Sequence, residues 1–521
     1  MASRIRGQVD VGTTLHLGVA PSASASDVPL TFADAAMRRV LPGLTPALHA
    51  SVLMALSMAS HFFGYEFARS SNLSSFTSKG TSGFGSDPGA FPLAMACVSP
   101  FSVLLLLGYG RELDLHGPRT ALRKTTLFCS AALSATALLS SAMERLGVGS
   151  SVKVRLPILG YDLTPARAVV WASFVFQNSY AHLLYAQQWS FIGSILTSEE
   201  GATWFASFAG LSSISSTIAG TMLSRWVETI GLNGLLVVAS LGLIVTAVLA
   251  DVAYDMSERH GFDPAEEIRK KEASKKESIG EAGKEKGKVQ EAVDLFRRVP
   301  ILGALFWEVI SFQSLSTILN VCFVTRLKEV VTDDALRAAW TGKFYSYVNG
   351  ASGLLQFLIL PLFMSYFDPS WVYRLMPLAP FVCTFWTAFQ DNPSLYLVAF
   401  SFFAAKVIDY TLRNVVNEMI YVPLDFDSRY KGKEIIGVFG SRFGKSGMSL
   451  LLSGLTYMFG SFGIQELARL TAVASTGWWA CTYRLSNLIP NRSKGSGAKK
   501  KKDGIAGRRG RGASPLSKKQ K

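Results

Sequence analysis

Residues 406–449 read KVIDYTLRNVVNEMIYVPLDFDSRYKGKEIIGVFGSRFGKSGMS, and this stretch decides how the chain is organised. It is as apolar as a membrane-spanning region, yet it carries charges at Lys406, Asp409, Arg413, Glu418, Arg442 and Lys445. A charged side chain at the centre of a bilayer costs about 2.5–3.5 kcal/mol on insertion scales, so such residues persist where they face a protein interior or an aqueous cavity. We therefore expect the stretch to line the inside of a bundle of membrane helices.

Four polar residues in this stretch are predicted to share one helix face. At about 100° per residue, Lys406, Asp409, Arg413 and Asn417 fall within a narrow arc. One interpretation is an i,i+4 ion pair between Asp409 and Arg413 that serves only helix packing. The other is a substrate pathway lined by cations, which we favour because Lys406 has no acidic partner left over in the local sequence.

Lys445 lies in a Gly-Lys-Ser triplet that is similar to the end of a phosphate-binding loop. That motif needs four residues between its glycines, whereas Gly440 and Gly444 enclose three, and the context is an apolar helix. We therefore predict no ATPase. Lys445 is instead a candidate point charge for a phosphate, with Arg442 one turn earlier able to make a forked contact. The alternative is that Lys445 extends to the membrane interface.

Composition independently indicates a polytopic membrane protein. Apolar residues make up 49% of the 521 residues and charged residues only 17%, whereas soluble chains carry about a quarter charged residues. Spans of about 20 apolar residues are expected near 46–68, 90–110, 125–143, 167–194, 202–224, 232–254, 299–324, 340–366, 371–390, 394–424, 434–461 and 464–486. The fold class is thus all-α, with about twelve transmembrane helices.

A charged stretch divides these spans into two sets of six. The predicted organisation is a cytosolic segment 1–45, a first six-helix half 46–256, a charged cytosolic linker 257–298, a second half 299–486 and a basic, disordered tail 487–521. Basic residues in the short loops place both termini in the cytosol. Such a division suggests a site between the halves, near the middle of the membrane.

The first half supplies polar residues that can face this site. In the first span, His61, Tyr65, Arg69 and Asn72 share a helix face, and Glu66 can orient Arg69 at i,i+3. The fourth span adds Gln177 and Tyr185, among other polar residues. These side chains can bind a base or a ribose, or they can hydrogen-bond neighbouring helices.

The same 406–449 stretch resembles the ATP/ADP translocases of plastids and intracellular bacteria. The resemblance rests on Tyr410-Thr411-Leu412, Glu418-Met419, Tyr421-Val422-Pro423-Leu424-Asp425, Lys431-Gly432-Lys433 and Gly444-Lys445-Ser446-Gly447. It implies twelve helices in a major-facilitator-like arrangement and a nucleotide as substrate. It also implies four charged site positions, which here read Asn72, Gln177, Phe323 and Lys445, while Asn417 replaces a lysine. Only Lys445 keeps the family's charge, which indicates a divergent member.

Our leading hypothesis is a secondary transporter that moves a nucleotide or related phosphorylated anion by alternating access. The cations of both halves would neutralise phosphates, Tyr65, Gln177 and Tyr185 would contact base or sugar, and Glu66, Asp409 and Glu418 would position the cations. One alternative is transport of a different organic anion, coupled to protons through His61 or Glu308. Another is a non-transporting scaffold or receptor. No catalytic or metal-ligand constellation is visible, so we expect neither an enzyme nor a cofactor.

The basic tail predicts binding partners and a cellular location. Residues after Asn491 hold eleven of the net fifteen positive charges, so they are expected to contact anionic lipid rather than nucleic acid. The chain ends Lys518-Lys519-Gln520-Lys521, which is similar to a dilysine retrieval signal. The endoplasmic reticulum or the plasma membrane is therefore favoured over a plastid envelope.

Overall fold

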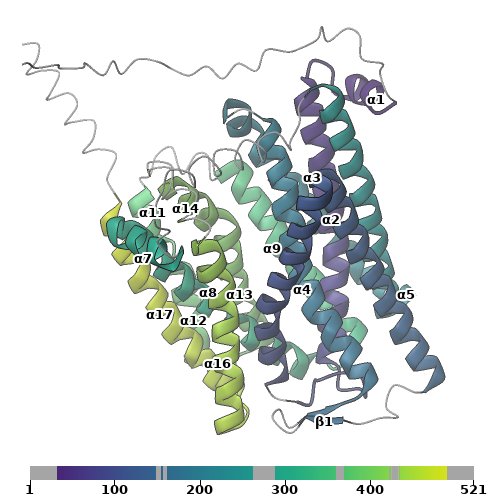
Figure 1. The fold of residues 1–521 in the computed structure, drawn as a ribbon. Coiled ribbons are helices and arrows are strands. Elements are labelled where there is room, and N and C mark those ends of the chain that lie inside the picture. Colours follow the sequence, from purple (N-terminus) through teal and green to yellow (C-terminus); the bar gives the residue numbers. More distant parts are fainter. Residues whose placement is uncertain are drawn as a thin grey trace, which may run out of the picture.

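The computed structural model describes residues 32–87, 89–147, 154–156, 161–196, 198–261, 288–359, 369–421, 424, 432 and 435–489. Within these residues the protein is a bundle of helices with one short β-hairpin (Figure 1). The charged run 262–287 and the basic tail lie outside the described residues, as do the segments 422–423 and 425–431.

The N-terminal bundle consists of α2 (Pro46–Thr77), α3 (Ala90–Leu146), α4 (Pro165–Ile195) and α5 (Ser198–Arg259), preceded by the short α1 (Phe32–Val40). Two of these elements each supply two of the predicted spans. α3 is broken at Gly117 and α5 at Gly231, where φ is 78° and 68°, a left-handed conformation that favours glycine. Strands β1 (Val154–Leu156) and β2 (Tyr161–Leu163) pair antiparallel between α3 and α4.

The C-terminal bundle begins with α7 (Lys288–Arg298) and the long α8 (Pro300–Val330). Its remaining elements are α9 (Asp334–Leu354), η2 (Leu355–Ile359), α11 (Pro369–Leu375), α12 (Leu378–Ala388), α13 (Leu395–Ile408), η3 (Asp409–Arg413), α14 (Asn414–Tyr421), η4 (Ile436–Arg442), α16 (Phe443–Phe459) and α17 (Ile464–Leu488). The three η elements are π-helical segments that adjoin α-helices: η2 follows α9, η3 joins α13 to α14, and η4 leads into α16. Such segments are often found at functional sites.

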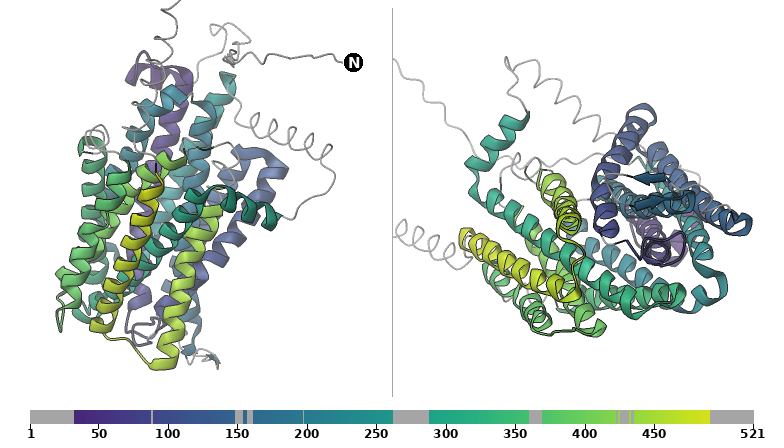
Figure 2. Two further views of the ribbon diagram at one scale, coloured as in Figure 1. Left: turned by 90° about the vertical axis from the view of Figure 1, so that its left-hand side faces the viewer. Right: turned by 90° about the horizontal axis from the view of Figure 1, so that it is seen from below.

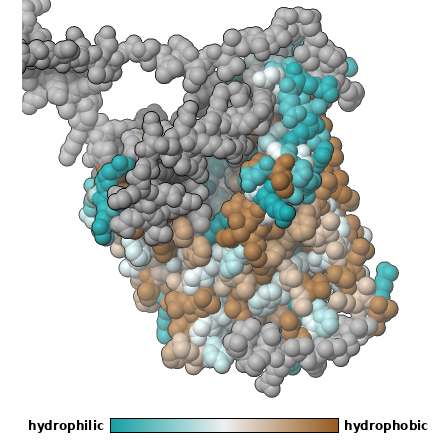
Figure 3. All heavy atoms as spheres, in the orientation of Figure 1, coloured by the Kyte–Doolittle hydropathy of each residue, from teal (hydrophilic) through white to brown (hydrophobic). Residues whose placement is uncertain are grey.

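The surface fits a membrane environment. Within the described residues, five helical stretches are long and apolar enough to cross a bilayer: Pro46–Thr77, Ala90–Leu146, Ser207–Arg259, Pro300–Val330 and Leu395–Asn417. Apolar colouring covers much of the body in Figure 3, whereas hydrophilic colouring gathers toward the upper end in that view. The prediction of an all-α polytopic membrane protein is confirmed.

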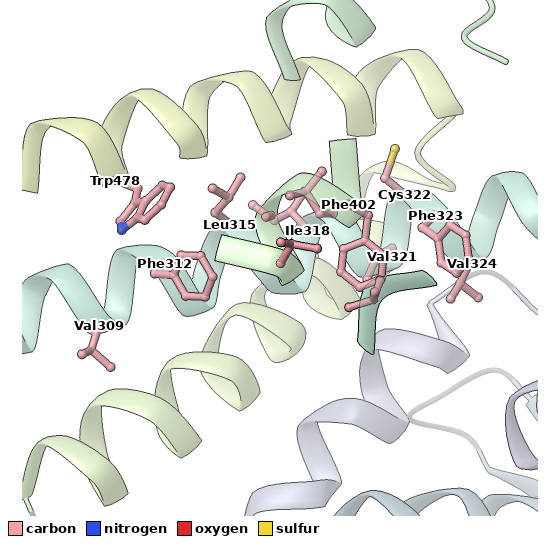
Figure 4. Close-up of a cluster of buried hydrophobic side chains, with 14 of the residues drawn as sticks. Val309, Phe312, Leu315, Ile318, Val321, Cys322, Phe323, Val324, Phe402 and Trp478 are labelled. Atoms are coloured by element: carbon pink, nitrogen blue, oxygen red, sulfur yellow. The ribbon is translucent and has the colours of Figure 1, made fainter. Parts of the chain in front are cut away.

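The two bundles stand side by side (Figures 1 and 2). One large apolar cluster lies mainly in the C-terminal bundle and includes Phe312 and Phe323 of α8, Phe402 of α13 and Trp478 of α17 (Figure 4). It extends into α2, α3 and α4, whereas a second cluster lies mainly in the N-terminal bundle. The boundaries of two six-helix halves stay a prediction.

Small residues bring the bundles into contact. α5 and α9 meet at Gly220 and Gly342, where a Cβ atom on Gly220 would lie 2.5 Å from the carbonyl oxygen of Gly342. α3 meets α16 through hydroxyl groups, because Ser446 Oγ lies 2.6 Å from Ser99 Oγ. These contacts place α2, α4, α13 and α16 around the region where the site residues gather.

Polar contacts also join the bundles at the end that carries the hairpin. Ser74 of α2 donates to the backbone carbonyl of Asp334, and Arg337 donates to the carbonyl of Ser74 at 3.2 Å and to that of Val331 at 2.9 Å. Lys328 reaches the carbonyl of Gly85 at 3.4 Å. This end of the bundle interface is therefore closed by hydrogen bonds.

Candidate functional site

A buried ion network lies inside the C-terminal bundle. The Arg413 guanidinium donates to both carboxylate oxygens of Glu308, at 2.9 and 3.0 Å, and to Asp409 at 2.9 Å. Trp478 Nε1 donates to the same Glu308 carboxylate at 2.9 Å. Arg413 is 4% exposed and Glu308 0% exposed, so the pair is withdrawn from solvent. The predicted pair of Asp409 and Arg413 is present, but the Arg413 guanidinium is bonded to the carboxylates of both Asp409 and Glu308.

The π-helical segment η3 explains why the predicted polar stripe divides. A π-helix closes i→i+5 hydrogen bonds, so it changes the angle per residue on which the stripe was based. Gln356 of η2 supports the segment by donating to the backbone carbonyl of Tyr410 at 2.7 Å. Asn417 then accepts a hydrogen bond from Tyr373, and Arg413 turns toward α8. Lys406 is left without either of them.

A second ion pair joins the bundles through the first predicted span. Arg69 donates to Glu66, as the i,i+3 spacing predicts, and Glu66 also accepts from Asn349 Nδ2 of α9 at 3.0 Å. The Arg69 guanidinium lies 3.2 Å from the centre of the Tyr345 ring and 5.4 Å from that of Tyr65. These contacts fix Arg69 at the interface and neutralise it.

Lys406 and Lys445 form no ion pair within the described part of the chain. The Lys406 ammonium lies 5.5 Å from the ring centre of Phe402 and 5.6 Å from that of Tyr410. It is within electrostatic range of Lys445, Asp409, Arg69 and Arg413. Lys445 in turn is within range of Asp409 and Arg413. The structure thus brings together two like charges that share one distant carboxylate.

His182 of α4 was not among the predicted site residues, although it belongs to the polar run of that span. Its side chain is exposed, whereas most of the residues around it on the helix are buried. It lies within electrostatic range of Lys445, Arg442 and Lys406. An exposed side chain in this position indicates space open to solvent between the bundles. The N-terminal bundle therefore faces the same region as the lysines.

Three other predicted residues of the N-terminal bundle are buried, namely Asn72, Gln177 and His61. Asn72 accepts from Ser173 Oγ at 2.6 Å, while its own amide nitrogen has no partner among the described residues. Gln177 also has an unpartnered amide nitrogen there. His61 Nδ1 lies 3.4 Å from Gln188 Oε1, and its Nε2 is likewise unpartnered.

Two half-buried tyrosines flank this group of polar residues. The rings of Tyr65 and Tyr185 pack edge-on against Phe62, at centroid distances of 6.3 and 5.4 Å. The N-terminal side of the site is thus aromatic and neutral, apart from the Glu66–Arg69 pair.

The remaining predicted positions are Phe323, Arg442 and Glu418. Phe323 is 0% exposed and stacks against Phe344 and Phe402, at 4.7 and 5.4 Å, so it belongs to the apolar core (Figure 4). Arg442 is half-buried at the end of η4, and its backbone carbonyl accepts from Ser99 Oγ at 2.9 Å. The side chain of Glu418 lies outside the described part.

Cavities at the hairpin end do not include the lysines. One of about 360 Å³ lies between the bundles and is lined by residues such as Phe84, Lys328 and Leu467. Another of about 730 Å³ lies in the N-terminal bundle, beside Ser78, Glu144 and Asn233. We place the site at Lys406 and Lys445 because their charges, rather than the volume of a cavity, distinguish this region.

Residues 395–487 match the family described as TLC ATP/ADP transporter. The chain is similar to ADP,ATP carrier protein 1 of Chlamydia trachomatis serovar D, with 46% identity over 59 residues, which is 11% of each chain. It is 37% identical over 89 residues to the protein of that name from Chlamydia muridarum, covering 16% of each chain. With the chloroplastic ADP,ATP carrier protein 1 of Arabidopsis thaliana it shares 33% identity over 94 residues, 18% of this chain and 15% of the relative. The chain thus matches less than a fifth of the length of these curated relatives.

Solved structures match over a much longer stretch. A bacterial homologue of the iron transporter ferroportin, in an inward-facing state, is similar with a TM-score of 0.55, 13% identity, and coverage of 84% of this chain and 99% of the other. The inward-open xylose transporter XylE from E. coli is similar with a TM-score of 0.53 and 10% identity, and the match covers 84% of this chain and 97% of the other. The nucleoside transporter NupG is similar with a TM-score of 0.51 and 12% identity, and the match covers 84% of this chain and 98% of the other. At these identities the likeness shows the fold, which is the predicted major-facilitator-like arrangement. The chain is therefore a multi-pass membrane protein of that fold, and over its last three spans it resembles the TLC ATP/ADP transporters as a divergent relative.

Proposed function

We propose that this protein is a secondary transporter that moves a nucleotide or a related phosphorylated anion between two faces of a membrane. The observation that carries the proposal is the pair of lysines, Lys406 and Lys445, at the bundle interface. Both are embedded among helices, both are within electrostatic range of each other, and neither forms an ion pair within the described residues. Two such ammonium groups repel each other, so an anion between them stabilises both.

The neighbouring charges favour a ligand at this position rather than a structural role for the lysines. Glu308 and Asp409 are bonded to Arg413, and Glu66 is bonded to Arg69. These carboxylates are thus already bonded to arginines, and Asp409 alone among them is also within electrostatic range of both Lys406 and Lys445. Phosphate oxygens are strong acceptors for charged donors, and the matched relatives are named ADP,ATP carriers.

The two bundles contribute different chemistry to the proposed site. Lys406, Lys445 and Arg442 of the C-terminal bundle would hold the phosphate end. Tyr65, Gln177 and Tyr185 of the N-terminal bundle would contact the base or sugar, since aromatic faces and unpartnered amides suit such groups. Alternating access then requires release of the hydrogen bonds at the hairpin end, such as that from Arg337 to Ser74.

Binding to purified variants tests this proposal. Lys445→Gln and Lys406→Gln should each weaken a phosphorylated ligand by about ten- to a hundred-fold, because a charge-assisted contact contributes about 1.5–3 kcal/mol. Affinity for the matching nucleoside should be unchanged. Lys343→Gln is the matched control, because Lys343 is exposed on α9. Equal losses for nucleoside and phosphorylated ligand, or no loss for either, would contradict the assignment of the lysines.

The compartment and the tail are part of the same proposal. A C-terminal dilysine signal would retain the transporter in the endoplasmic reticulum, and the lysine-rich tail would contact anionic lipid on the cytosolic face. Both features lie outside the described residues.

A further inference from the structure

The charge balance of the site limits the charge of the ligand it can enclose. Among the described side chains of the two ion-pair clusters and the cations within electrostatic range of His182, five are basic and three are acidic, so the excess is two positive charges. The bases are Arg69, Lys406, Arg413, Arg442 and Lys445, and the acids are Glu66, Glu308 and Asp409.

This excess is concentrated on one side. Arg69 and Glu66 neutralise each other, and Asn349 donates to the remaining carboxylate oxygen. Arg413 faces two carboxylates, so that cluster carries one negative charge. Lys406, Lys445 and Arg442, which all lie within electrostatic range of His182, carry three positive charges. The local field therefore suits a compact dianion at the lysines.

At three positions the resemblance implies charged residues, one lysine and two glutamates, and none of the three holds a cation here. Asn72 is buried and accepts from Ser173. Gln177 is buried and neutral, and Phe323 is enclosed by Phe344 and Phe402. Burying charge without compensation is costly. Each negative charge beyond two would thus enter an interior that has no described counter-charge for it.

We infer that the preferred ligand carries about two negative charges on one phosphate group, as a phosphate monoester such as a nucleoside monophosphate does. This inference rests on the proposed function and deepens it. A monoester carries about 1.5 to 2 negative charges near pH 7, which matches the excess. One phosphate group presents three oxygens, enough to accept from Lys406 and Lys445 together and leave one for Arg442.

A ligand series on the purified full-length protein tests the inference. Affinities for cyclic AMP, AMP, ADP and ATP are measured without magnesium at constant ionic strength, with adenosine as the uncharged reference. We expect a maximum at AMP, with ATP roughly tenfold weaker and cyclic AMP, a monoanion, also weaker. Inorganic phosphate should compete with AMP better than tripolyphosphate does, which shows that the preference lies in the phosphate group.

The outcomes separate this inference from the proposed function. Affinity that rises steadily from AMP to ATP would overturn the dianion preference and leave a phosphate-binding transporter in place. Affinity no greater for any nucleotide than for adenosine would overturn both.

A variant checks the mechanism of the preference. Lys445→Gln lowers the excess to one, so the ratio of cyclic AMP affinity to AMP affinity should rise by roughly tenfold. Lys343→Gln should leave this ratio unchanged. An unchanged ratio in a folded Lys445→Gln protein would contradict the charge-balance argument, and the wild-type series decides the matter if that variant does not fold.

Discussion

The buried network around Glu308 predicts a large loss of stability from one small substitution. Glu308→Gln keeps the shape of the side chain but removes its charge, so Arg413 retains Asp409 as its one described counter-charge. It also exchanges a carboxylate acceptor for an amide at the hydrogen bond from Trp478, which is 2.9 Å long. We therefore expect the C-terminal bundle to unfold more readily.

The size of the effect follows from burial. Removing one partner of a buried ion pair costs about 3–5 kcal/mol, mainly because the other charge stays buried. Asp409 still compensates Arg413 here, so we expect the lower end, about 3 kcal/mol. In domains of similar size to one bundle, each kcal/mol corresponds to about 2–4 °C. Tm should therefore fall by about 6–12 °C.

Thermal unfolding in detergent, followed by intrinsic fluorescence, measures this change. Glu329→Gln is the matched control, because Glu329 forms a pair with Arg326 but is 43% exposed. Such surface pairs contribute about 0–1 kcal/mol, so the control should melt near the wild type. Trp478→Phe, which removes one hydrogen bond to the carboxylate, should give an intermediate shift.

A double variant tests the cause. Glu308→Met combined with Arg413→Met leaves no buried charge from the pair, so it should recover much of the lost stability. Asp409 can then turn toward the lysines. If Glu308→Gln melts with the wild type, or if the double variant is far less stable than the single one, the network is not the stabilising ion pair described above.

Three further predictions concern other parts of the chain. Phe323→Glu, which restores a family charge, should lower Tm and expression without creating ATP/ADP exchange, whereas Phe323→Leu should be tolerated; exchange by a stable Phe323→Glu protein would contradict its place in the core. Cysteines introduced into 262–287 and 490–521 should react with an impermeant reagent from the same, cytosolic side, and labelling from opposite sides would refute the topology. Lys518→Ser with Lys519→Ser should redistribute an N-terminally tagged protein away from the endoplasmic reticulum in imaging, and an unchanged pattern would show that the signal is inactive.

Local spacing predicted the local ion pairs of this protein. Asp409 and Arg413 are four residues apart on one helix and Glu66 and Arg69 three apart, so both pairs could be inferred from sequence. The partner that determines the role of Arg413 is Glu308, 105 residues away in sequence. No local rule connects these positions, because their contact depends on how α8 packs against the later helices.

The shape of the site depended on features that periodicity does not reveal. The stripe from Lys406 to Asn417 assumed a regular α-helix, and the π-helical η3 changed the direction of the later residues. Phe323 was a candidate through resemblance alone, and its aromatic neighbours come from α9 and α13. Lys445 and Lys406 were named from their unpaired charges, whereas His182 was overlooked because a single histidine in a polar run gives no such signal.

The close approach of α5 and α9 affects how the two bundles can move. At Gly220 and Gly342 the backbones approach each other closely beside the side chains of Leu223 and Ser346, and a Cβ atom on Gly342 would lie 3.2 Å from the carbonyl oxygen of Gly220. Interdigitated side chains resist rotation of one helix over another because they must repack, and here the nearest side chains to the two glycines are those of Ser346 and Leu223. This crossing is therefore a natural pivot, about which one bundle can tilt while the hydrogen bonds at the hairpin end break or form. Even a methyl group at either glycine would push the two helices apart at this crossing and bias the protein toward one orientation of its bundles.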